Sequence, residues 1–590
     1  MSLEKLANKY APMLSNREVA KIFLEISEYL AMDDVPFKPR AYERAAEAVI
    51  AQEEAVADIW KHGGKKALRA IPGIGQAISE KIEELIKTGR LKYYETLKKK
   101  MPVDVTGLTA IEGVGPKAIK ILWQKLGIRN LDDLEKAARA GRIRAIPRFG
   151  AKSQEKILKG IALLKTSSGR RILGNILPWL STFEATIRKF PNVARAVIAG
   201  SVRRRKETVG DIDILVVSAK PSEVMKNFIN LSEVAHVYGS GPTKTLVRLK
   251  NGLDADLRVV PEKSFGAALN YFTGSKEHNV ALREIAIKRG MKLNEYGLFR
   301  GKKMRAGGTE SGLYKALGLR YIEPELRENR GEIDAARRNK LPKLINYGDI
   351  VGDLQVQTNW TDGEHSISEM ARAAAQIGLH YIAITDHTKS LRVANGLDAR
   401  RIVRQWREID EVNTDLKRRG IQFRVLKGTE CDILKDGTLD LPDRILAKLD
   451  VVGISVHSHF GLSEPEQTRR IIRAMSNPYV DILFHPTGRL IGKREPIAVN
   501  IEDIIKTAKH AGIILEINSF PERTDLKDEY IKKAVEASVL LSVDSDAHNR
   551  KHFAFIEYGV AQARRGWAEK KDIVNAHALP RLLALLNKKR

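Results

Sequence analysis

Apolar side chains recur at helical spacing through the first part of the chain. In residues 19–32, VAKIFLEISEYLAM, they fall three and four positions apart, and alternating β-branched residues are scarce up to about residue 165. We therefore predict a mostly helical region there. From about 192 to 260 apolar and polar positions alternate instead, which predicts strands. The pair Asn251-Gly252 between two of these strands predicts a two-residue hairpin.

The second half of the chain repeats a different pattern. Helices return from about 264 to 317, and a charged segment with few large apolar residues follows. Beyond it, apolar strands alternate with helices to the end of the chain, which predicts a parallel α/β barrel. A length of 590 residues is too great for one core. We expect a multidomain α+β chain with these parts: 1–100, a helical N-terminal domain; 101–168, a second helical subdomain; 169–262, a subdomain built on strands; 263–320, a helical or mixed subdomain; 321–347, a linker; and 348–590, a distorted barrel.

A short glycine pattern repeats inside the helical region. Residues 71–75 read IPGIG, residues 111–115 read IEGVG, and residues 146–150 are a third, degraded copy with Arg148 in place of glycine. Such a turn brings backbone N–H groups to a helix N-terminus, where they can meet a phosphate oxygen. A helix C-cap is the common alternative. The repeat resembles the helix-hairpin-helix motif, which implies that DNA-backbone contacts come from Gly73, Gly75, Gly113 and Gly115.

The charge balance points to a polyanion as partner. The formal net charge is +28 and the isoelectric point is near 9.8, so nucleic acid is the first expectation and a membrane surface the competitor. No apolar run of about 18 residues is found, and the start MSLEKLANKY lacks the apolar core of a signal peptide. Cys431 is the only cysteine, which fits a reducing cytoplasm.

Residues 200–216, GSVRRRKETVGDIDILV, carry the most specific chemistry. Side chains alternate along a strand, so Asp211 and Asp213 share one face, and two close carboxylates suit Mg²⁺ ions that also bind substrate phosphates. The preceding Gly-Ser turn can offer N–H groups to those phosphates. An exposed acidic strand end is the plain alternative. A two-metal site needs about three carboxylates, and either Asp254 or Asp256 on the next strand can supply the third.

The segments YFTGSKEHNVALR (271–283) and LNEYGLF (293–299) make the resemblance close. The Gly-Ser turn and the acidic strand after it resemble the active-site motif of the nucleotidyltransferase superfamily, and all these segments together resemble the family X DNA polymerases. The resemblance implies that 101–168 binds DNA, that 169–262 is a nucleotidyltransferase palm and that 263–320 is a thumb-like subdomain that binds the nascent base pair. The resemblance implies that Asp211, Asp213 and Asp256 bind metals, that Asp256 takes the proton of the primer 3′-hydroxyl, and that Asp254 is a neighbour. The implied nucleotide-binding residues are Gly200, Ser201, Arg204 and Gly210 at the triphosphate, Tyr271, Phe272 and Gly274 at the sugar, Asn279 at the incoming base and Arg283 at the template strand.

The same resemblance implies a second activity in the N-terminal domain. Family members that remove 5′-deoxyribose phosphate use a lysine in the helix after the first glycine turn, where this chain has Lys81. Such a lysine must be partly deprotonated to form a Schiff base. Lys38 and Tyr42 match supporting positions, whereas Ala77 stands where lyase-active relatives carry another lysine. A surface lysine on an amphipathic helix is the alternative reading of Lys81.

Strands of the C-terminal part end in metal-binding residue types. Six predicted strand ends carry His, Asp or Glu, a mixture typical of transition-metal sites. This half resembles a PHP (polymerase and histidinol phosphatase) domain, which in polymerase X chains degrades DNA from the 3′ end. The resemblance implies the metal ligands Asp362, His387, Glu430, His457, His485, Asp546 and His548.

The first strand of the barrel departs from the family pattern. It normally carries two histidines as H-x-H, but this chain has Gln355 and Gln357. An amide oxygen is a neutral, weak ligand, poor for Zn²⁺ and tolerable for Mg²⁺ or Mn²⁺. We therefore expect one or two retained metals, Mn²⁺ or Zn²⁺, and weakened or lost nuclease activity. His365 is a less favoured substitute ligand.

These observations predict a DNA polymerase that fills short gaps in base excision repair, with Mg²⁺ or Mn²⁺ at the palm. Gapped or primer-template DNA and deoxynucleoside triphosphates are the expected partners, and a cytoplasmic monomer without membrane contact is the expected state. A nuclease-led end-processing enzyme is the first alternative, and the glutamines count against it. A DNA-binding scaffold is the second, and the intact palm carboxylates count against that.

Overall fold

The computed structural model describes residues 16–50, 52, 54–109, 111, 114–147, 149–165 and 170–586. Backbone contacts divide the chain into two compact units. The first unit comprises Met1–Arg171, Ser181–Ala199 and Gly210–Phe272, and the second comprises Ile172–Leu180, Gly200–Val209 and Thr273–Arg590. The chain therefore passes between the units several times before it enters the long C-terminal part of the second unit.

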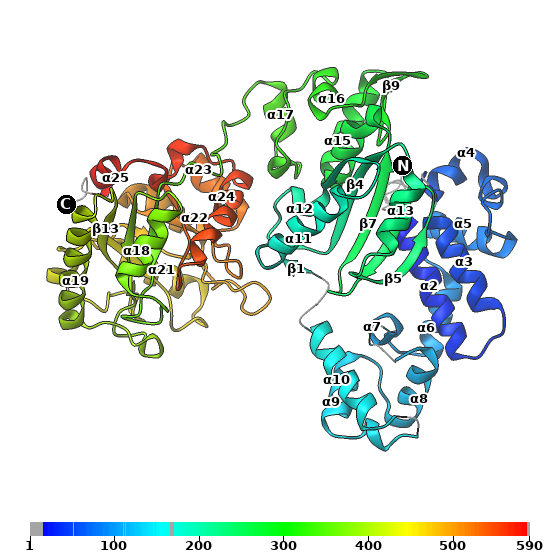
Figure 1. Ribbon diagram of the computed structural model, residues 1–590, viewed down its shortest axis with the longest axis horizontal. Helices are drawn as coiled ribbons and strands as arrows, with labels where there is room; N and C mark the ends of the chain where they lie inside the picture. The colour runs from blue at the N-terminus through cyan, green and yellow to red at the C-terminus, as the bar shows by residue number, and fades with distance from the viewer. Residues whose placement is uncertain are drawn as a thin grey trace. The chain divides into compact units, whose positions relative to one another are not determined.

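Amphipathic helices form the N-terminal part of the first unit, drawn in blue to cyan in Figure 1. Phe23, Ile26 and Leu30, at helical spacing, are almost fully buried and form part of a continuous apolar core, which confirms the predicted helical region. The helices are α2 (Asn16–Met32), α3 (Lys38–Ile50), α4 (Val56–Arg69), α5 (Gln76–Thr88), α6 (Lys92–Lys100), α7 (Val105–Thr109), α8 (Pro116–Leu126), α9 (Leu131–Arg139), η1 (Ile143–Ala145) and α10 (Ala151–Lys165).

Two of the glycine turns begin helices. Gly75 is the N-cap of α5 and Gly115 is the N-cap of α8, both with extended backbone and without a side chain to cover the first N–H groups of the helix. Gly73 has a φ of +93°, a conformation that favours glycine. Gly113 and Arg148 lie outside the described residues. The third copy ends at Gly150, directly before α10.

A five-stranded sheet forms the palm of the first unit. Its strand order is β2-β4-β7-β6-β5, in which β4 and β7 are parallel neighbours at the centre. Their sequences, DIDILVVS and DADLRVV, alternate in burial near the N-terminal end, so one face buries Ile212 and Ala255. The elements are α11 (Leu173–Arg188), β2 (Val193–Ile198), β4 (Asp211–Ser218), α13 (Pro221–Ile229), β5 (Val234–Ser240), β6 (Lys244–Leu249) and β7 (Asp254–Val260).

The hairpin between β6 and β7 differs in detail from the prediction. The strands pair antiparallel as expected, with Arg248 opposite Asp254, but the connection spans residues 250–253 rather than two residues. Leu249 N–H donates to the carbonyl of Leu253, and Gly252 takes a φ of +85° within the turn. The Asn-Gly pair therefore forms the turn but not its whole length.

Residues 262–347 mix helices with a small sheet. The elements are η2 (Glu262–Ser264), α14 (Phe265–Thr273), α15 (Lys276–Lys288), β8 (Lys292–Asn294), β9 (Gly297–Arg300), β10 (Lys303–Ala306), α16 (Glu310–Ala316), η3 (Pro324–Leu326) and α17 (Glu332–Arg337). The segment 321–347, which we predicted to be a linker, is packed instead. Ile322, Leu326 and Ile333 join the core around Tyr314, and Arg327 is fully buried against Glu310. The charged composition of this segment suggested exposure to solvent, but charged side chains such as Arg327 form ion pairs within the fold.

The C-terminal part of the second unit is a nearly closed barrel of seven parallel strands, drawn in yellow-green to red in Figure 1. The strands follow one another in sequence order, and a bridge between Val356 and Ala547 joins the ends of the first and last strands. The predicted fold class is thus confirmed. The strands are β11 (Gly352–Val356), β12 (Tyr381–Ile384), β13 (Arg424–Asp432), β14 (Val451–Ser455), β15 (Ile482–Leu483), β16 (Ile514–Asn518) and β17 (Leu541–Asp544).

Helices cover the barrel and bury its main apolar core. They are α18 (Ile367–Gln376), α19 (Ala399–Arg418), α20 (Asp443–Leu446), α21 (Glu464–Met475), α22 (Ile501–Ala511), α23 (Asp528–Glu536), α24 (Ile556–Arg565) and α25 (Leu579–Leu586). Seven parallel strands place their carboxyl ends at one rim, where the predicted metal ligands stand. Among the described residues, no helix is long and apolar enough to cross a membrane.

Candidate active sites

The palm carboxylates lie on one face of the central strand pair. The parallel register sets Asp211 opposite Asp254 and Asp213 opposite Asp256. The residues between them, Ile212 and Ala255, are fully buried, so the aspartates project from the other face. Four acidic side chains on two adjacent strands concentrate negative charge, which a divalent cation can balance.

Arg248 distinguishes the two candidates for the third carboxylate. Its Nε lies 2.8 Å from Asp254 Oδ1 across the β6–β7 hairpin. Asp256 Oδ1 is buried and has no hydrogen-bond partner among the described residues, and Arg258 Nε is 3.6 Å away. Asp254 Oδ1 is likewise buried without a hydrogen bond among the described residues, so the two differ in their cations: Arg248 pairs closely with Asp254, whereas Arg258 lies farther from Asp256. This favours Asp256, as the family resemblance implied.

The predicted triphosphate residues surround a short helix, α12 (Gly200–Arg203). Gly200 has a φ of +60°, and the carbonyl of Ser201 accepts a hydrogen bond from Lys206 N–H, which closes a tight turn. The guanidinium of Arg204 donates to Glu328 and to the carbonyl of Thr273. Gly210 stands directly before β4.

The predicted sugar and base residues follow on α14 and α15. Tyr271 and Phe272 contact each other edge to face at 5.1 Å, and the Arg258 guanidinium lies 4.5 Å over the Phe272 ring. Gly274 has a φ of +70°, and a Cβ there would come within 3.0 Å of Arg204 Nη1. Asn279 is buried and Arg283, one turn further along α15, is exposed. These two side chains therefore occupy different surroundings on the same helix.

In the N-terminal helices, Lys81 lies beside an aromatic pair. Its Nζ is 5.0 Å from the centre of the Tyr93 ring, and Tyr93 stacks on Tyr42 at 6.2 Å. Lys81 is half-buried on α5, and Lys38 begins α3. The Tyr42 ring therefore lies against the ring that Lys81 contacts.

Two groups of three ligand residues meet at the rim of the barrel. Asp362, His387 and His548 form one group, and His387, Glu430 and His457 form the other, with the ligand atoms of each within 4.8 Å of one another. Among the described residues, the palm trio Asp211, Asp213 and Asp256 does not form so tight a group. His387 and Glu430 are buried, His457 and His548 are partly buried, and Asp362 is exposed. Imidazole and carboxylate groups at this spacing suit a transition-metal ion.

Glu430 is the centre of the barrel site. It is about 1% exposed and accepts from His485 Nε2 at 2.8 Å, and His457 Nε2 and His387 Nδ1 lie 3.1 and 3.4 Å from its carboxylate oxygens. Burial raises its pKa, but His387 and His457 more than offset this and hold the pKa well below its usual range. An ionised carboxylate among imidazoles is the charge arrangement that a cation requires.

The pKa values of the four histidines at the barrel rim shift in different directions, depending on the neighbouring groups. Burial lowers the pKa of His387 and of His485. Burial also acts against charge on His457 and His548, yet carboxylates raise each pKa to about 9: Glu430 and Asp432 do so at His457, and Asp362 and Asp546 do so at His548. His387 Nδ1 and His485 Nδ1 are buried without a hydrogen-bond partner among the described residues, so the donor set fits a metal.

Gln355 and Gln357, at the end of the first strand of the barrel, make amide hydrogen bonds at the rim. Gln357 Nε2 donates to Glu430 Oε2 at 2.8 Å, and Asn518 Nδ2 donates to Gln355 Oε1 at 3.1 Å. Asn518 also donates to Asp546, and the guanidinium of Arg523 lies 3.4 Å from the same carboxylate. Gln357 Oε1 is buried without a hydrogen-bond partner among the described residues, so Gln357 can offer an ion only a neutral amide oxygen, which is a weaker ligand for Zn²⁺ than imidazole.

Sequence reasoning missed several residues of these sites. Arg258 and Asp432 each lie two positions beyond a predicted ligand on the same strand, so strand alternation could have indicated them. Asn518 carried no such signal, because its contact with Gln355 depends on how the barrel closes. Of the predicted residues, Gly113 cannot be placed, because it lies outside the described residues.

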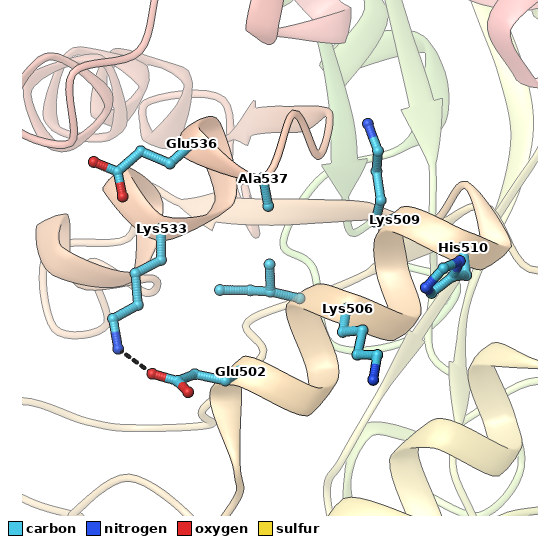
Figure 2. Close-up of a pocket in the computed structure, with 8 residues that line it drawn as sticks. Glu502, Lys506, Lys509, His510, Lys533, Glu536 and Ala537 are labelled. Atoms are coloured by element: carbon cyan, nitrogen blue, oxygen red, sulfur yellow. Dashed lines mark hydrogen bonds and ion pairs between the residues drawn. The ribbon is translucent and has the colours of Figure 1, made fainter.

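A shallow pocket of about 460 Å³ lies elsewhere on the barrel, between α22 and α23. Figure 2 shows Lys506, Lys509 and His510 on α22, with Lys533 facing Glu502 at 2.6 Å. None of the predicted metal ligands lines it, so it is separate from the barrel site.

Together, the strand-borne carboxylates and the histidine-rich barrel rim define a nucleotidyltransferase joined to a metal-dependent barrel. Models of known families match four regions of the chain. The helix-hairpin-helix domain matches residues 14–91, the SAM-like helix-hairpin-helix tandem 105–162, the DNA polymerase beta thumb 268–328 and the PHP domain 353–572.

Individual relatives specify the family. The chain is 35% identical over 580 residues to the DNA polymerase/3′-5′ exonuclease PolX of Bacillus subtilis (strain 168). The aligned region covers 98% of this chain and all of that protein. It is 27% identical over 289 residues to DNA polymerase lambda of Rattus norvegicus, which covers 44% of this chain and 48% of that protein. A probable phosphatase of Thermoanaerobacter sp. (strain X514) is 36% identical over 208 residues, 33% of this chain and 78% of that protein. The chain belongs to the PolX family of DNA polymerases.

Proposed function

We propose that this enzyme fills short gaps in DNA during repair by template-directed addition of deoxynucleotides. The observation that carries the proposal is the register of β4 and β7, which sets Asp213 beside Asp256 on a face where Asp256 has an oxygen without a hydrogen bond among the described residues. Asp211, Asp213 and Asp256 would hold two Mg²⁺ or Mn²⁺ ions, which supply activation of the primer 3′-hydroxyl and balance charge on the triphosphate. Asp256 accepts the hydroxyl proton.

Other residues orient the reactants. Arg204, with backbone N–H groups of the Gly200-Ser201 turn, binds the triphosphate. Tyr271, Phe272 and Gly274 exclude a 2′-hydroxyl by bulk and backbone contact. Asn279 contacts the incoming base and Arg283 the template strand. Gly73, Gly75, Gly113 and Gly115 contact the DNA backbone through helix N-terminal N–H groups, without reading sequence.

For the barrel we propose a metal site with a weakened 3′-5′ exonuclease activity. The groups around Asp362 and around Glu430 support one or two ions, Mn²⁺ or Zn²⁺, whereas the Gln355 and Gln357 amides support the loss of a further one. The metals would supply an activated water for hydrolysis. Glu430 and the surrounding histidines hold them in place.

Two finer points are also proposed. The protein acts as a monomer in the cytoplasm, on gapped or primer-template DNA.

Lys81, beside Tyr93 and Tyr42, removes 5′-deoxyribose phosphate through a Schiff base. Borohydride trapping of a labelled 5′-deoxyribose phosphate end tests the last point: wild type should be labelled and Lys81→Ala should not. Equal labelling of both would refute the role of Lys81.

Primer extension on a one-nucleotide gap tests the main proposal. Extension and 3′ shortening are followed in the same reaction, with Mg²⁺ or Mn²⁺, for wild type, Asp256→Ala and His485→Ala. We expect Asp256→Ala to lose extension alone and His485→Ala to lose 3′ shortening alone. Extension by Asp256→Ala at the wild-type rate would refute the palm site.

A further inference from the structure

The loop that follows α12 is held by side chains of the barrel within the second unit. Glu207 accepts from Arg489, with 2.6 Å between Oε2 and Nη2 and 3.3 Å between Oε1 and Nη1. Arg489 is 3% exposed, and it also donates to the carbonyls of Arg523 and Thr524. A guanidinium fixed by two backbone carbonyls presents a rigid fork to a carboxylate. The barrel therefore determines where Glu207 lies.

A second barrel arginine holds Arg204 itself. Arg565, near the end of α24, is 4% exposed and donates through Nη1 to the carbonyl of Arg204 at 2.7 Å and to Glu328 at 3.1 Å. Its Nη2 donates to Asp528, which lies in the barrel at the start of α23. The Arg565 guanidinium thus binds the barrel through Nη2 and the loop after α12 through Nη1.

Glu328 connects the two arginines. One of its oxygens accepts from Arg204 Nε at 3.1 Å and from Arg565, and Lys206 Nζ lies 3.8 Å away. Arg204 is therefore fixed twice, at its backbone carbonyl by Arg565 and at its side chain by Glu328. The groups involved are mostly buried, so the loss of one leaves its partner charge poorly solvated.

We propose that the barrel positions the loop that follows α12 and, with it, Arg204. Arg565 acts through Glu328, and Arg489 acts through Glu207, so both are positioning residues for Arg204. The inference rests on the proposed function in which Arg204 binds the triphosphate. A guanidinium ordered beforehand loses less conformational freedom when the nucleotide arrives, so the barrel raises nucleotide affinity without touching the nucleotide. The barrel thus serves the polymerase reaction independently of its own metals.

The test uses the full-length chain with Arg565→Ala, Glu328→Gln and Glu207→Gln. We expect KM for the deoxynucleoside triphosphate to rise about two- to tenfold, the range for one side chain that must be ordered on binding. Since the same contact serves ground and transition states, kcat should stay constant. The Kd for gapped DNA should not change either. Glu207→Gln removes only a charge from a partly exposed side chain, so it keeps the test valid if Arg565→Ala does not fold.

Arg473→Ala is the matched control, because Arg473 is an exposed barrel arginine whose ion pair with Asp436 is 3.7 Å long. Its KM should equal that of wild type. The double variant Arg565→Ala, Glu328→Gln should raise KM by less than the product of the single effects, because both act on Arg204.

The inference is overturned if KM is unchanged in all three variants. It is also overturned if kcat, metal content and unfolding temperature all fall together in these variants. A lower KM for Glu328→Gln would also overturn it, because Glu328 would then compete with the nucleotide for Arg204. A wild-type enzyme that extends no primer would refute the proposed function instead.

Discussion

The palm and the barrel rim both gather acidic residues for metals, but they do so by different routes. In the palm, two adjacent strands in register bring carboxylates to one face, and the ligands are oxygens alone. At the barrel rim, ligands from separate strand ends meet, and imidazoles surround one buried carboxylate, Glu430. The palm is thus suited to ions that share their shell with a substrate, whereas the barrel is suited to ions held by the protein itself.

The comparison extends to how each site tolerates loss. The palm needs few ligands, so each of them is indispensable. The barrel has a larger ligand set, because two groups of three ligand residues lie at the rim beside the amides of Gln355 and Gln357. A site with surplus ligands can lose part of its metal set and keep the rest, and the four predictions below test this contrast.

The largest effect is expected from Asp256→Ala. Removal of a carboxylate that binds metal and takes the proton should slow primer extension by about 10³-fold or more. Single-turnover extension on gapped DNA measures it. The barrel's metal content should stay at the wild-type value, and a fall there would show that the two sites are not independent.

A smaller effect is expected from Glu430→Gln. Loss of the central negative charge should weaken metal binding at the barrel by about 10- to 100-fold. Metal analysis after dialysis against a graded chelator provides the measurement. Glu411→Gln, on the exposed side of α19, is the matched control and should bind metal like wild type. Undiminished metal in Glu430→Gln would contradict the assigned centre.

The double change Gln355→His, Gln357→His should act in the opposite direction. Two imidazoles would replace the amides beside Glu430 and Asp546, which should add one bound metal per chain and raise Mn²⁺-dependent 3′ shortening about tenfold. Metal stoichiometry and 3′ digestion are both followed in an Asp256→Ala background. Strong digestion already present before the change would show that the glutamines do not weaken the site.

The smallest effect is expected from Asp254→Asn. Asp254 shares the acidic face with Asp256, but Arg248 lies 2.8 Å from it. The change should therefore slow extension by no more than about threefold, within the range of a partly exposed ion pair of up to about 1 kcal/mol. The same single-turnover assay decides, and a loss as large as that of Asp256→Ala would reverse the assignment of the third carboxylate.

Local patterns revealed the parts of these sites that depend on neighbouring residues. Strand alternation alone put Asp211 and Asp213 on one face, and strand–helix repeats put the histidines at the barrel rim. The choice between Asp254 and Asp256 needed the position of Arg248 across the hairpin, because both aspartates have the same spacing.

Contacts between distant parts of the chain were out of reach. The sequence marked 321–347 as charged, but not that Arg327 would be buried against Glu310 or that Glu328 would bind Arg204 and Arg565. Such pairs form only after the fold has brought the segments together, and no periodic pattern in the sequence records them.

The amide contacts of Gln355 and Gln357 have a consequence for how the barrel rim tolerates single substitutions. Each glutamine takes part in a buried hydrogen bond of its own. A mutation that introduces histidine at one position alone breaks such a bond, at a cost of about 1–3 kcal/mol, before a second imidazole is present to compensate. Histidine at both positions is therefore reached only through a less stable single variant, whichever glutamine is changed first.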